Sequence, residues 1–214
     1  MGARKLKPKL GNRIIRDQAE QNGVAMFPRY GAPRGVSIKL NKKLSRLKLV
    51  RPTPGLTPSR GFLKLGQRFV GCVLGPAGAV WRKKEGDLAT PRGSFSLLTG
   101  QYRADRVFRP TSLQILKVTK RNDTWCDDQA SFQYNRPSAA PVRFGHEKLW
   151  LEVRAYDVVL PLNYNYQPRR LGAGSAIFLH LTENFGPTAG CIAVSLRDMR
   201  KILNQISTAA KLNV

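Results

Sequence analysis

Short apolar stretches that end at turn residues recur along most of the chain. Apolar and polar residues alternate from Lys42 to Val50, which is the pattern of a half-buried strand. Glycine and proline punctuate the following stretches, and the polar segment from Asp127 to Pro141 is predicted to be a long loop. Further strands are predicted at 69–74, 79–83, 94–98, 113–118, 149–151, 156–160 and 175–180. The pattern therefore indicates many short strands joined by turns.

One stretch of the chain has clear helical spacing. Its apolar positions are Leu196, Met199, Ile202, Leu203 and Ile206. Ser195 precedes the stretch and Asp198 follows three residues later, which predicts an N-cap in the manner of a capping box. Many short strands with this helix predict a mainly β domain with one or two short helices, which we place at residues 47–214.

The first 46 residues differ in character from the rest of the chain. They are rich in Lys, Arg, Gly and Pro, show weak periodicity, and are predicted to form a basic, flexible segment. The whole chain has 37 Lys and Arg against 13 Asp and Glu, a formal net charge of +24. Residues 1–66 contain 16 of these bases and two of the acids. Such a charge attracts nucleic acid, anionic lipid and anionic cell-wall polymers without choosing among them.

Composition excludes several classes of protein. Hydrophobic residues make up 42% of the chain, which is enough for a packed core and argues against a fully disordered chain. No stretch approaches the roughly 18 apolar residues of a membrane span, and no secretory signal peptide is visible near the N-terminus. The three cysteines, Cys72, Cys126 and Cys191, are too few for a disulfide scaffold and are badly spaced for zinc.

A histidine and a cysteine near the C-terminus form the best candidate for chemistry. His180 ends a strongly apolar strand, and a loop with Gly186 leads to Gly190 and Cys191. Adjacent strand ends can bring an imidazole to a thiol, which activates the thiol as a nucleophile. The backbone N–H groups of Gly190 and Cys191 could then form an oxyanion hole. Residue type alone leaves the alternative open that Cys191 is a buried small hydrophobe and His180 a core histidine.

These residues resemble the catalytic motif of the L,D-transpeptidase catalytic domain family (YkuD-like). His180 followed by Thr188-Ala189-Gly190-Cys191-Ile192 is similar to the family's His, loop and Ser/Thr-His-Gly-Cys. The segment Thr90-Pro91-Arg92-Gly93-Ser94-Phe95 also resembles a family motif, and residues 125–128, 134–136, 146–147 and 156–157 resemble a bacterial branch. The resemblance covers about residues 47–205. It departs from the usual pattern at Ala189, where histidine is common, and at Ala193, where arginine or asparagine is common.

The resemblance implies a β-sandwich fold and acyl transfer on peptidoglycan stem peptides, without a metal or organic cofactor. Cys191 would attack the carbonyl of the third residue of a tetrapeptide, and His180 would accept the thiol proton and pass it to the leaving D-alanine. A second stem, or an acceptor protein, would then resolve the thioester. The candidate substrate contacts are Thr188, Arg136, Tyr134 and Trp125, with the Arg136 guanidinium suited to a carboxylate.

Two alternatives to a transpeptidase follow from the sequence. Water as the acceptor would make the protein an L,D-carboxypeptidase. A basic protein that has lost catalysis and binds cell wall or nucleic acid would explain Ala189 and the basic N-terminal third. The implied reaction needs no nucleic acid and no integral membrane segment, and it places the protein in the periplasm or cell envelope.

Overall fold

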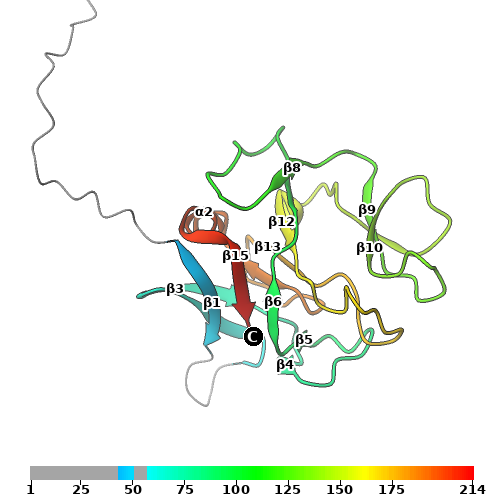
Figure 1. Cartoon of the computed structure of the whole chain (residues 1–214), viewed down its shortest axis with the longest axis horizontal. Coiled ribbons are helices and arrows are strands. Elements are labelled where there is room, and N and C mark those ends of the chain that lie inside the picture. Colours follow the sequence, from blue (N-terminus) through cyan, green and yellow to red (C-terminus); the bar gives the residue numbers. More distant parts are fainter. Residues whose placement is uncertain (1–42, 51–56) are drawn as a thin grey trace, which may run out of the picture. The chain divides into compact units, whose positions relative to one another are not determined.

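The computed structural model describes residues 43–50 and 57–214, and these ranges are mainly β (Figure 1). Of the predicted basic segment 1–46, only the last four residues are described, and Leu44 there begins the first strand. The rest of that prediction lies outside the described residues. The fold class predicted from the short apolar runs is confirmed, with one α-helix and one short 3-10 helix in the described part of the chain.

Ten strands of the described chain form one sheet, in the order β6, β15, β1, β2, β3, β14, β13, β12, β7, β8. Most neighbours are antiparallel, whereas β1 with β15, β13 with β14, and β7 with β8 are parallel. The bounds of the strands are β1 Leu44–Val50, β2 Arg60–Leu65, β3 Arg68–Val73, β6 Ser94–Ser96, β7 Gly100–Tyr102, β8 Leu116–Val118, β12 Val158–Pro161, β13 Phe178–Leu181, β14 Ile192–Val194 and β15 Ile206–Asn213.

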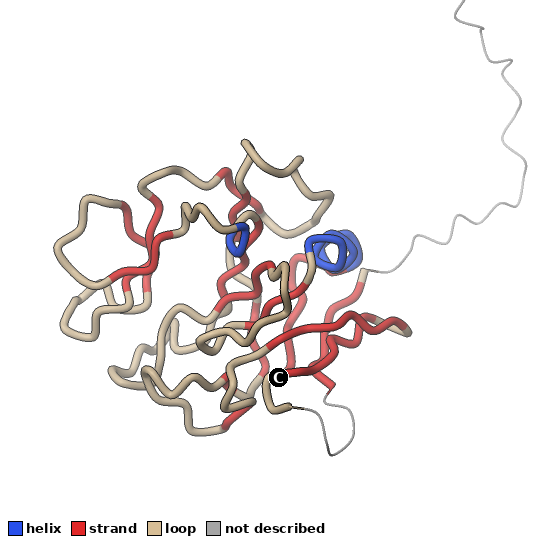
Figure 2. The backbone as a smooth tube through the Cα atoms, turned by 180° about the vertical axis from the view of Figure 1, so that it is seen from behind, coloured by secondary structure: helices blue, strands red, loops and turns tan. Residues whose placement is uncertain are grey.

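The large sheet curls so that its two halves approach each other. Strand β6 stands at one end of the strand order, yet the chain just after it pairs with the end of β12. Leu97 forms an antiparallel bridge with Leu162, and the Leu98 N–H donates to the Pro161 carbonyl over 2.8 Å. Figure 2 shows the strands wrapping around the interior rather than lying in a flat layer.

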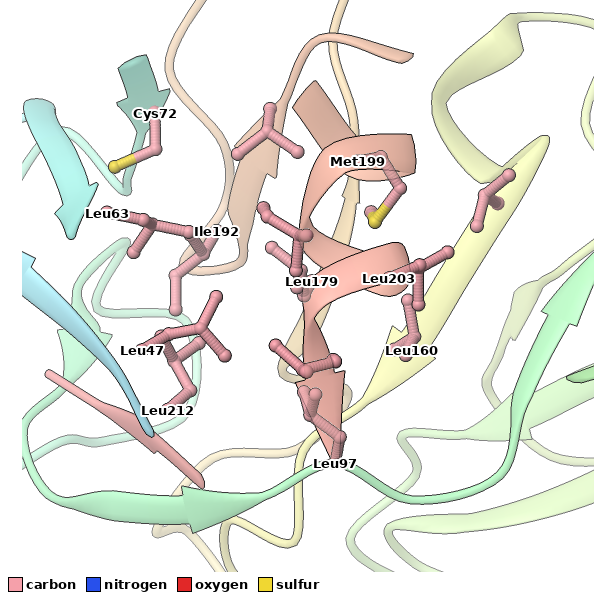
Figure 3. Packing of buried hydrophobic residues seen from close by; sticks show 14 of the residues in the cluster. Leu47, Leu63, Cys72, Leu97, Leu160, Leu179, Ile192, Met199, Leu203 and Leu212 are labelled. Carbon is pink, nitrogen blue, oxygen red and sulfur yellow. The ribbon is translucent and has the colours of Figure 1, made fainter. Parts of the chain in front are cut away.

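The main hydrophobic core fills the inside of this curl. Side chains alternate between the two faces of a strand, so every second residue of β13 and β14 points inward. Helix α2 (Leu196–Gln205) packs its buried face, Met199, Ile202 and Leu203, against the same core. Figure 3 shows part of this core, with Leu47, Leu63, Leu160, Leu179, Ile192, Met199, Leu203 and Leu212 labelled. The sheet and the helix therefore share one core, and the other face of β13 and β14 is left for the site.

Two smaller sheets accompany the large one, and the first of them corrects the prediction of a long loop at 127–141. The first contains β9 (Asp123–Cys126) between β10 (Arg136–Ala139) and β11 (His146–Lys148), and the second pairs β4 (Ala79–Val80) with β5 (Thr90–Pro91). The strand β10 lies inside the predicted loop because it pairs with β9, which precedes that loop, and periodicity within 127–141 does not reveal the pairing. The strand predicted at 149–151 is wrong, since β11 ends at Lys148.

The C-terminal helix begins as predicted but ends one residue earlier. The Ser195 hydroxyl accepts a hydrogen bond from the Asp198 N–H over 3.1 Å, which confirms the N-cap. The Asp198 carboxylate accepts from the Ser195 hydroxyl over 2.9 Å. Ile206, predicted as the last apolar position of the helix, has extended backbone angles and begins β15. Its side chain is buried in either case, so its burial alone could not locate the helix end.

The described chain holds its three cysteines as free thiols. Cys72 lies in the main core and Cys126 is buried on β9. No helix among residues 43–50 and 57–214 is long and apolar enough to cross a membrane.

Candidate active site

Strands β13 and β14 bring His180 and Cys191 to the same face of the sheet. The strands are parallel, with Leu179 paired with Ile192 and His180 paired with Ala193. Leu179 and Ile192 point into the main core, so the residues before and after them point to the opposite face. Cys191 precedes Ile192 and is therefore diagonal to His180 across the strand pair. The local fold thus delivers the thiol and the imidazole to one surface.

The Cys191 thiol is buried and hydrogen-bonded on both sides. Its sulfur accepts from the Phe178 N–H over 3.3 Å, and the thiol donates to the Ala176 carbonyl over 3.2 Å. Burial raises the pKa of Cys191 to about 12, although the Phe178 N–H acts in the opposite direction because it favours the thiolate. The resting residue is a neutral thiol whose position is fixed by the backbone of the neighbouring segment.

A close backbone contact requires the glycine that precedes Cys191. Gly190 has φ of +140°, and a Cβ atom there would lie 2.6 Å from the Ala89 carbonyl oxygen. Gly75 packs on the same loop, where a Cβ would come 2.1 Å from the Leu88 carbonyl oxygen and 3.2 Å from the Gly190 Cα. Both positions need glycine because side chains do not fit between these backbone segments. The contact sets the position of Cys191 relative to the 87–90 loop.

Thr188 braces the loop that leads to the thiol. Its hydroxyl donates to the Cys191 carbonyl over 2.6 Å and accepts from the Gly190 N–H over 3.2 Å, while its own N–H donates to the Leu74 carbonyl. The Gly190 N–H predicted for an oxyanion hole is therefore bonded to a hydroxyl in this structure. It can turn to an oxyanion only when the Thr188 hydroxyl releases it.

The His180 imidazole is buried between backbone carbonyls and an aromatic ring. Its Nδ1 lies 2.9 Å from the Leu181 carbonyl oxygen, and the Tyr156 ring packs edge-on with a centroid separation of 5.2 Å. Burial lowers the pKa of His180, although the carbonyl oxygens of Leu181 and Ala155 favour the protonated ring. The hydrogen bond at Nδ1 requires a proton there in the neutral ring, which leaves Nε2 as the basic nitrogen.

An aromatic and acidic layer supports the Cys191 and His180 side chains. The Phe178 ring packs edge-on against Trp125 and against Tyr156, with centroid separations of 5.3 and 5.8 Å. The Tyr156 hydroxyl donates to Glu147 Oε1 over 2.9 Å. Burial raises the pKa of Glu147 and of Tyr156. This layer fixes the Tyr156 ring against His180 and brings a carboxyl group to the same surface.

The face that carries Cys191 and His180 opens into a cavity of about 610 Å³. Its wall comes from three parts of the chain, namely residues 83–88, 147–156 and 175–193, together with Asp127. The charged side chains of the wall are Lys83, Glu85, Asp127, Glu147, Arg154 and Glu183. A volume of this size is typical of a ligand-binding pocket.

Hydrogen bonds to the Asp87 carboxylate fix residues 83–89 of the cavity wall. The Asp87 carboxylate accepts from Lys83 Nζ over 2.6 Å and from the N–H groups of Lys84 and Ala89 over 2.7 and 2.9 Å. Burial opposes ionisation of Asp87, but these hydrogen bonds outweigh it and lower its pKa. The Asp87 carboxylate thus balances the positive charge of Lys83. The bond from the Ala89 N–H also holds the Ala89 backbone against Gly190.

The structure separates the predicted site residues into two groups. Thr188, Cys191 and His180 line the cavity. Trp125 and Tyr134 are at most 3% exposed and lie outside the lining, where Trp125 Nε1 donates to Asn135 and the Tyr134 hydroxyl donates to Glu85. These two side chains are placed to support the wall.

Arg136, the candidate partner of a substrate carboxylate, also stands apart from the lining. Its guanidinium carbon lies 3.9 Å from the Tyr166 ring centroid, and its Nη1 donates to the Asn135 carbonyl. The stacking explains the position of this arginine within the fold.

Several wall residues were not singled out by sequence reasoning. Lys83, Glu147, Tyr156 and Arg154 reach the cavity from segments far apart in the chain. Glu147 and Tyr156 belong to the motifs of the bacterial branch, so that signal pointed to them without giving a role. Arg154 carries no local signal in a chain with 37 basic residues.

Comparison with known proteins agrees with this geometry. Among the described residues, no group of three His, Cys, Asp or Glu side chains is arranged to hold a metal ion. No curated protein and no solved structure matches the chain. The family model of the L,D-transpeptidase catalytic domain, YkuD, matches residues 60–214, which include both strands and the whole cavity wall. The chain therefore belongs to the YkuD family of L,D-transpeptidase catalytic domains, whose members are cysteine transpeptidases that act on peptidoglycan.

Proposed function

We propose that the protein is a peptidoglycan L,D-transpeptidase that acts through a Cys191 thioester on tetrapeptide stems. The observation that carries the proposal is the diagonal placement of Cys191 and His180 on one face of β13 and β14, at the wall of a single cavity. Both side chains are held by backbone hydrogen bonds, so the pair is preorganised without a cofactor.

The proposed acylation balances with these two groups alone. The Cys191 sulfur attacks the carbonyl carbon of the third residue of the stem, and the thiol proton passes to His180 Nε2. The carbon–nitrogen bond to the terminal D-alanine then breaks, and His180 gives the proton to the leaving amine. The product is a thioester on Cys191 and free D-alanine. In the second half, an acceptor amine attacks the thioester, a new amide forms, and the sulfur regains its proton.

Burial of both groups favours proton transfer during attack rather than before it. The Cys191 pKa is raised and the His180 pKa is lowered, so a neutral thiol faces a neutral imidazole. A permanent thiolate–imidazolium pair is disfavoured in this environment. The substrate must therefore reach the thiol before the proton moves, which protects the nucleophile between turnovers.

The tetrahedral intermediate needs donors for its oxygen. The N–H of Cys191 and the N–H of Gly190 are the proposed donors, the second after release from the Thr188 hydroxyl. The exchange gives Thr188 a role in the site, because its hydroxyl holds the loop through the Gly190 N–H and the Cys191 carbonyl.

The acceptor is proposed to be the amine of a second stem, in the cell envelope where peptidoglycan lies. The basic charge of the chain supports residence near an anionic polymer, with an attraction that salt weakens. Release of D-alanine to water instead would make the protein an L,D-carboxypeptidase, and the same experiment distinguishes the two.

The test is mass spectrometry of tetrapeptide muropeptides incubated with the full chain and with Cys191→Ala. We expect a cross-linked dimer with loss of D-alanine, absent in the variant, and a loss of most activity in His180→Ala. His146→Gln is the matched control, because His146 bonds to the Phe144 carbonyl and lies outside the cavity lining.

Three outcomes would change the proposal. Loss of D-alanine without a dimer would assign a carboxypeptidase. Full activity in Cys191→Ala would overturn the cysteine mechanism. No product from the unmodified chain, together with salt-dependent binding of nucleic acid or cell wall, would favour a binding protein on this fold.

A further inference from the structure

Among the described residues that line the cavity, one cationic side chain is free to meet a ligand. Apart from His180, its basic lining residues are Lys83 and Arg154. The Lys83 side chain is 3% exposed and bonded to Asp87 over 2.6 Å, so its charge is already neutralised. The Arg154 side chain is 58% exposed and reaches Glu183 through Nε alone, over 3.9 Å. An exposed pair at this distance is weak, and a ligand can replace it.

Arg154 stands next to the residues that contact His180. It begins the 3-10 helix η1 (Arg154–Tyr156), in which the Ala155 carbonyl lies at the imidazole and the Tyr156 ring packs edge-on against it. Arg154 is therefore one residue away from the contact that holds the proposed base.

A second arginine fixes the segment that carries Arg154. Arg106 Nη1 donates to the Leu151 carbonyl over 3.3 Å and to the Glu152 carbonyl over 2.9 Å, and it also reaches Asp157 Oδ1 over 3.4 Å. These bonds lie on both sides of η1 in the chain. The backbone at Arg154 is thus preorganised, while its side chain stays exposed.

We propose that Arg154 binds the carboxylate of the D-amino acid that the reaction releases, and that Glu183 holds the guanidinium until the substrate arrives. This inference rests on the proposed function. The leaving amine must approach His180 to receive its proton, and in an α-amino acid the carboxylate is attached to the carbon that bears this amine. A guanidinium on the wall of the same cavity can therefore meet the carboxylate and bind it through two parallel hydrogen bonds.

The proposed contact explains how the enzyme selects a stem that ends in a free carboxylate. Glu183 follows β13 and is itself 68% exposed, so it can turn to solvent when the substrate displaces it. The exchange replaces a long, single-atom ion pair by a bidentate one inside the cavity. The contact with Arg154 would thus contribute binding energy through the terminal residue, which is the one that the reaction releases.

The experiment compares two donor tetrapeptides, one with a C-terminal carboxylate and one with a C-terminal carboxamide. We expect the unmodified chain to prefer the carboxylate at least about tenfold in kcat/KM, measured by mass spectrometry of the released D-alanine or its amide. Arg154→Ala should lose about tenfold on the carboxylate, chiefly through KM, and stay unchanged on the carboxamide. Arg154→Lys should recover part of the preference.

Two further variants complete the test. Glu183→Gln removes the competing carboxylate and is expected to lower KM for the carboxylate peptide about two- to threefold. Arg197→Ala is the matched control, because Arg197 is an exposed arginine of α2 outside the cavity lining, and both of its donor activities should be unchanged.

The outcomes separate this inference from the proposed function. Equal losses of Arg154→Ala on both peptides, or no loss on the carboxylate, would overturn the role of Arg154 while the transpeptidase assignment stands. A higher KM in Glu183→Gln would overturn the exchange of partners. No release from either peptide by the unmodified chain would overturn the proposed function and this inference with it.

Discussion

Cys191 and His180 are both held in their neutral forms by burial. The sulfur lies between the Phe178 N–H and the Ala176 carbonyl, and the imidazole lies against the Leu181 carbonyl and the Tyr156 ring. Burial raises the thiol pKa and lowers the imidazole pKa, so the two titrations move apart. The working form of the pair is therefore present over a wide range of pH.

The pH profile of acylation follows from these directions. His180 accepts a proton only in its neutral form, which predominates above its lowered pKa. We expect the single-turnover rate of D-alanine release to rise with pH through a pKa below the ordinary 6.5 of histidine. It should then stay level to about pH 9, because the Cys191 thiol loses its proton only near 12.

Two carboxyl groups of the cavity provide the control for this profile. Burial raises the pKa of Glu147 and Asp127, so they also titrate above the usual carboxyl range. If His180 causes the rise of the rate at low pH, this rise should remain in Glu147→Gln and in Asp127→Asn. A bell-shaped profile with a fall between pH 7 and 8 would contradict the neutral pair and indicate a thiolate–imidazolium pair.

At the scale of elements, the strand pair β13 and β14 separates the core from the chemistry. One face of the pair packs on α2 and the inside of the sheet, and the other carries Cys191 and His180. Cys191, the proposed nucleophile, is positioned through backbone contacts at Gly75 and Gly190. A change in these contacts therefore moves its sulfur directly.

Gly190→Ala tests this dependence on the backbone. The new Cβ would lie 2.6 Å from the Ala89 carbonyl oxygen, at a φ of +140° that alanine rarely adopts. We expect a fall of about 2 kcal/mol in the free energy of unfolding. Displacement of the thiol by about 1 Å should also lower turnover about 100-fold.

Gly71→Ala is the matched control for that variant. A Cβ at Gly71 meets no atom within 4 Å, and Gly71 is not among the glycines with positive φ. Urea unfolding followed by fluorescence and a turnover assay should show little change. Normal turnover in Gly190→Ala would mean that the close contact does not position Cys191.

The elements differ in how much of them the sequence reveals. The helix after Ser195 was predicted from its spacing and cap, and its end was not, because Ile206 is buried in a helix and in a strand alike. Alternation revealed β1, whereas β10 is held by pairing with β9, 10 residues earlier at its nearest pair. Local patterns thus found elements with their own signal and missed those that depend on a partner.

At the scale of the whole molecule, the C-terminal strand is internal to the sheet. β15 lies between β1 and β6, with Leu212 paired with Leu47 on one side and Phe95 on the other. The backbone of Val214 exchanges two hydrogen bonds with Gly93. The last residues of the domain therefore join its first described strand to the edge of the curl.

Leu212→Ala is expected to destabilise the whole domain. The side chain is fully buried in the main core, so its loss leaves a cavity and should lower the free energy of unfolding by about 2–5 kcal/mol. Lys211→Ala on the same strand is exposed and should change it by less than about 0.5 kcal/mol. Equal midpoints of urea unfolding for the two variants would contradict an internal role for β15.

The candidate site was predicted only in part. The Cys191–His180 pair follows from a local motif, since the two residues lie on consecutive strands joined by one loop. The remainder of the wall comes from outside the large sheet, with Lys83 between β4 and β5, Glu147 on β11 and Arg154 on η1. Arg136 has the chemistry for a carboxylate but stacks on Tyr166. Residue type identified the chemistry, and the fold decided which residue of that type reaches the site.

The positions of the three thiols allow Cys191 to be labelled selectively. Cys72 is packed in the core and Cys126 is fully covered on β9, whereas Cys191 lines the cavity. An electrophile small enough to enter the cavity therefore meets a single sulfur in the folded chain. A fluorophore or affinity tag can then be attached at one known atom without replacing the other cysteines, and occupancy of the cavity by any ligand can be read as protection of that atom.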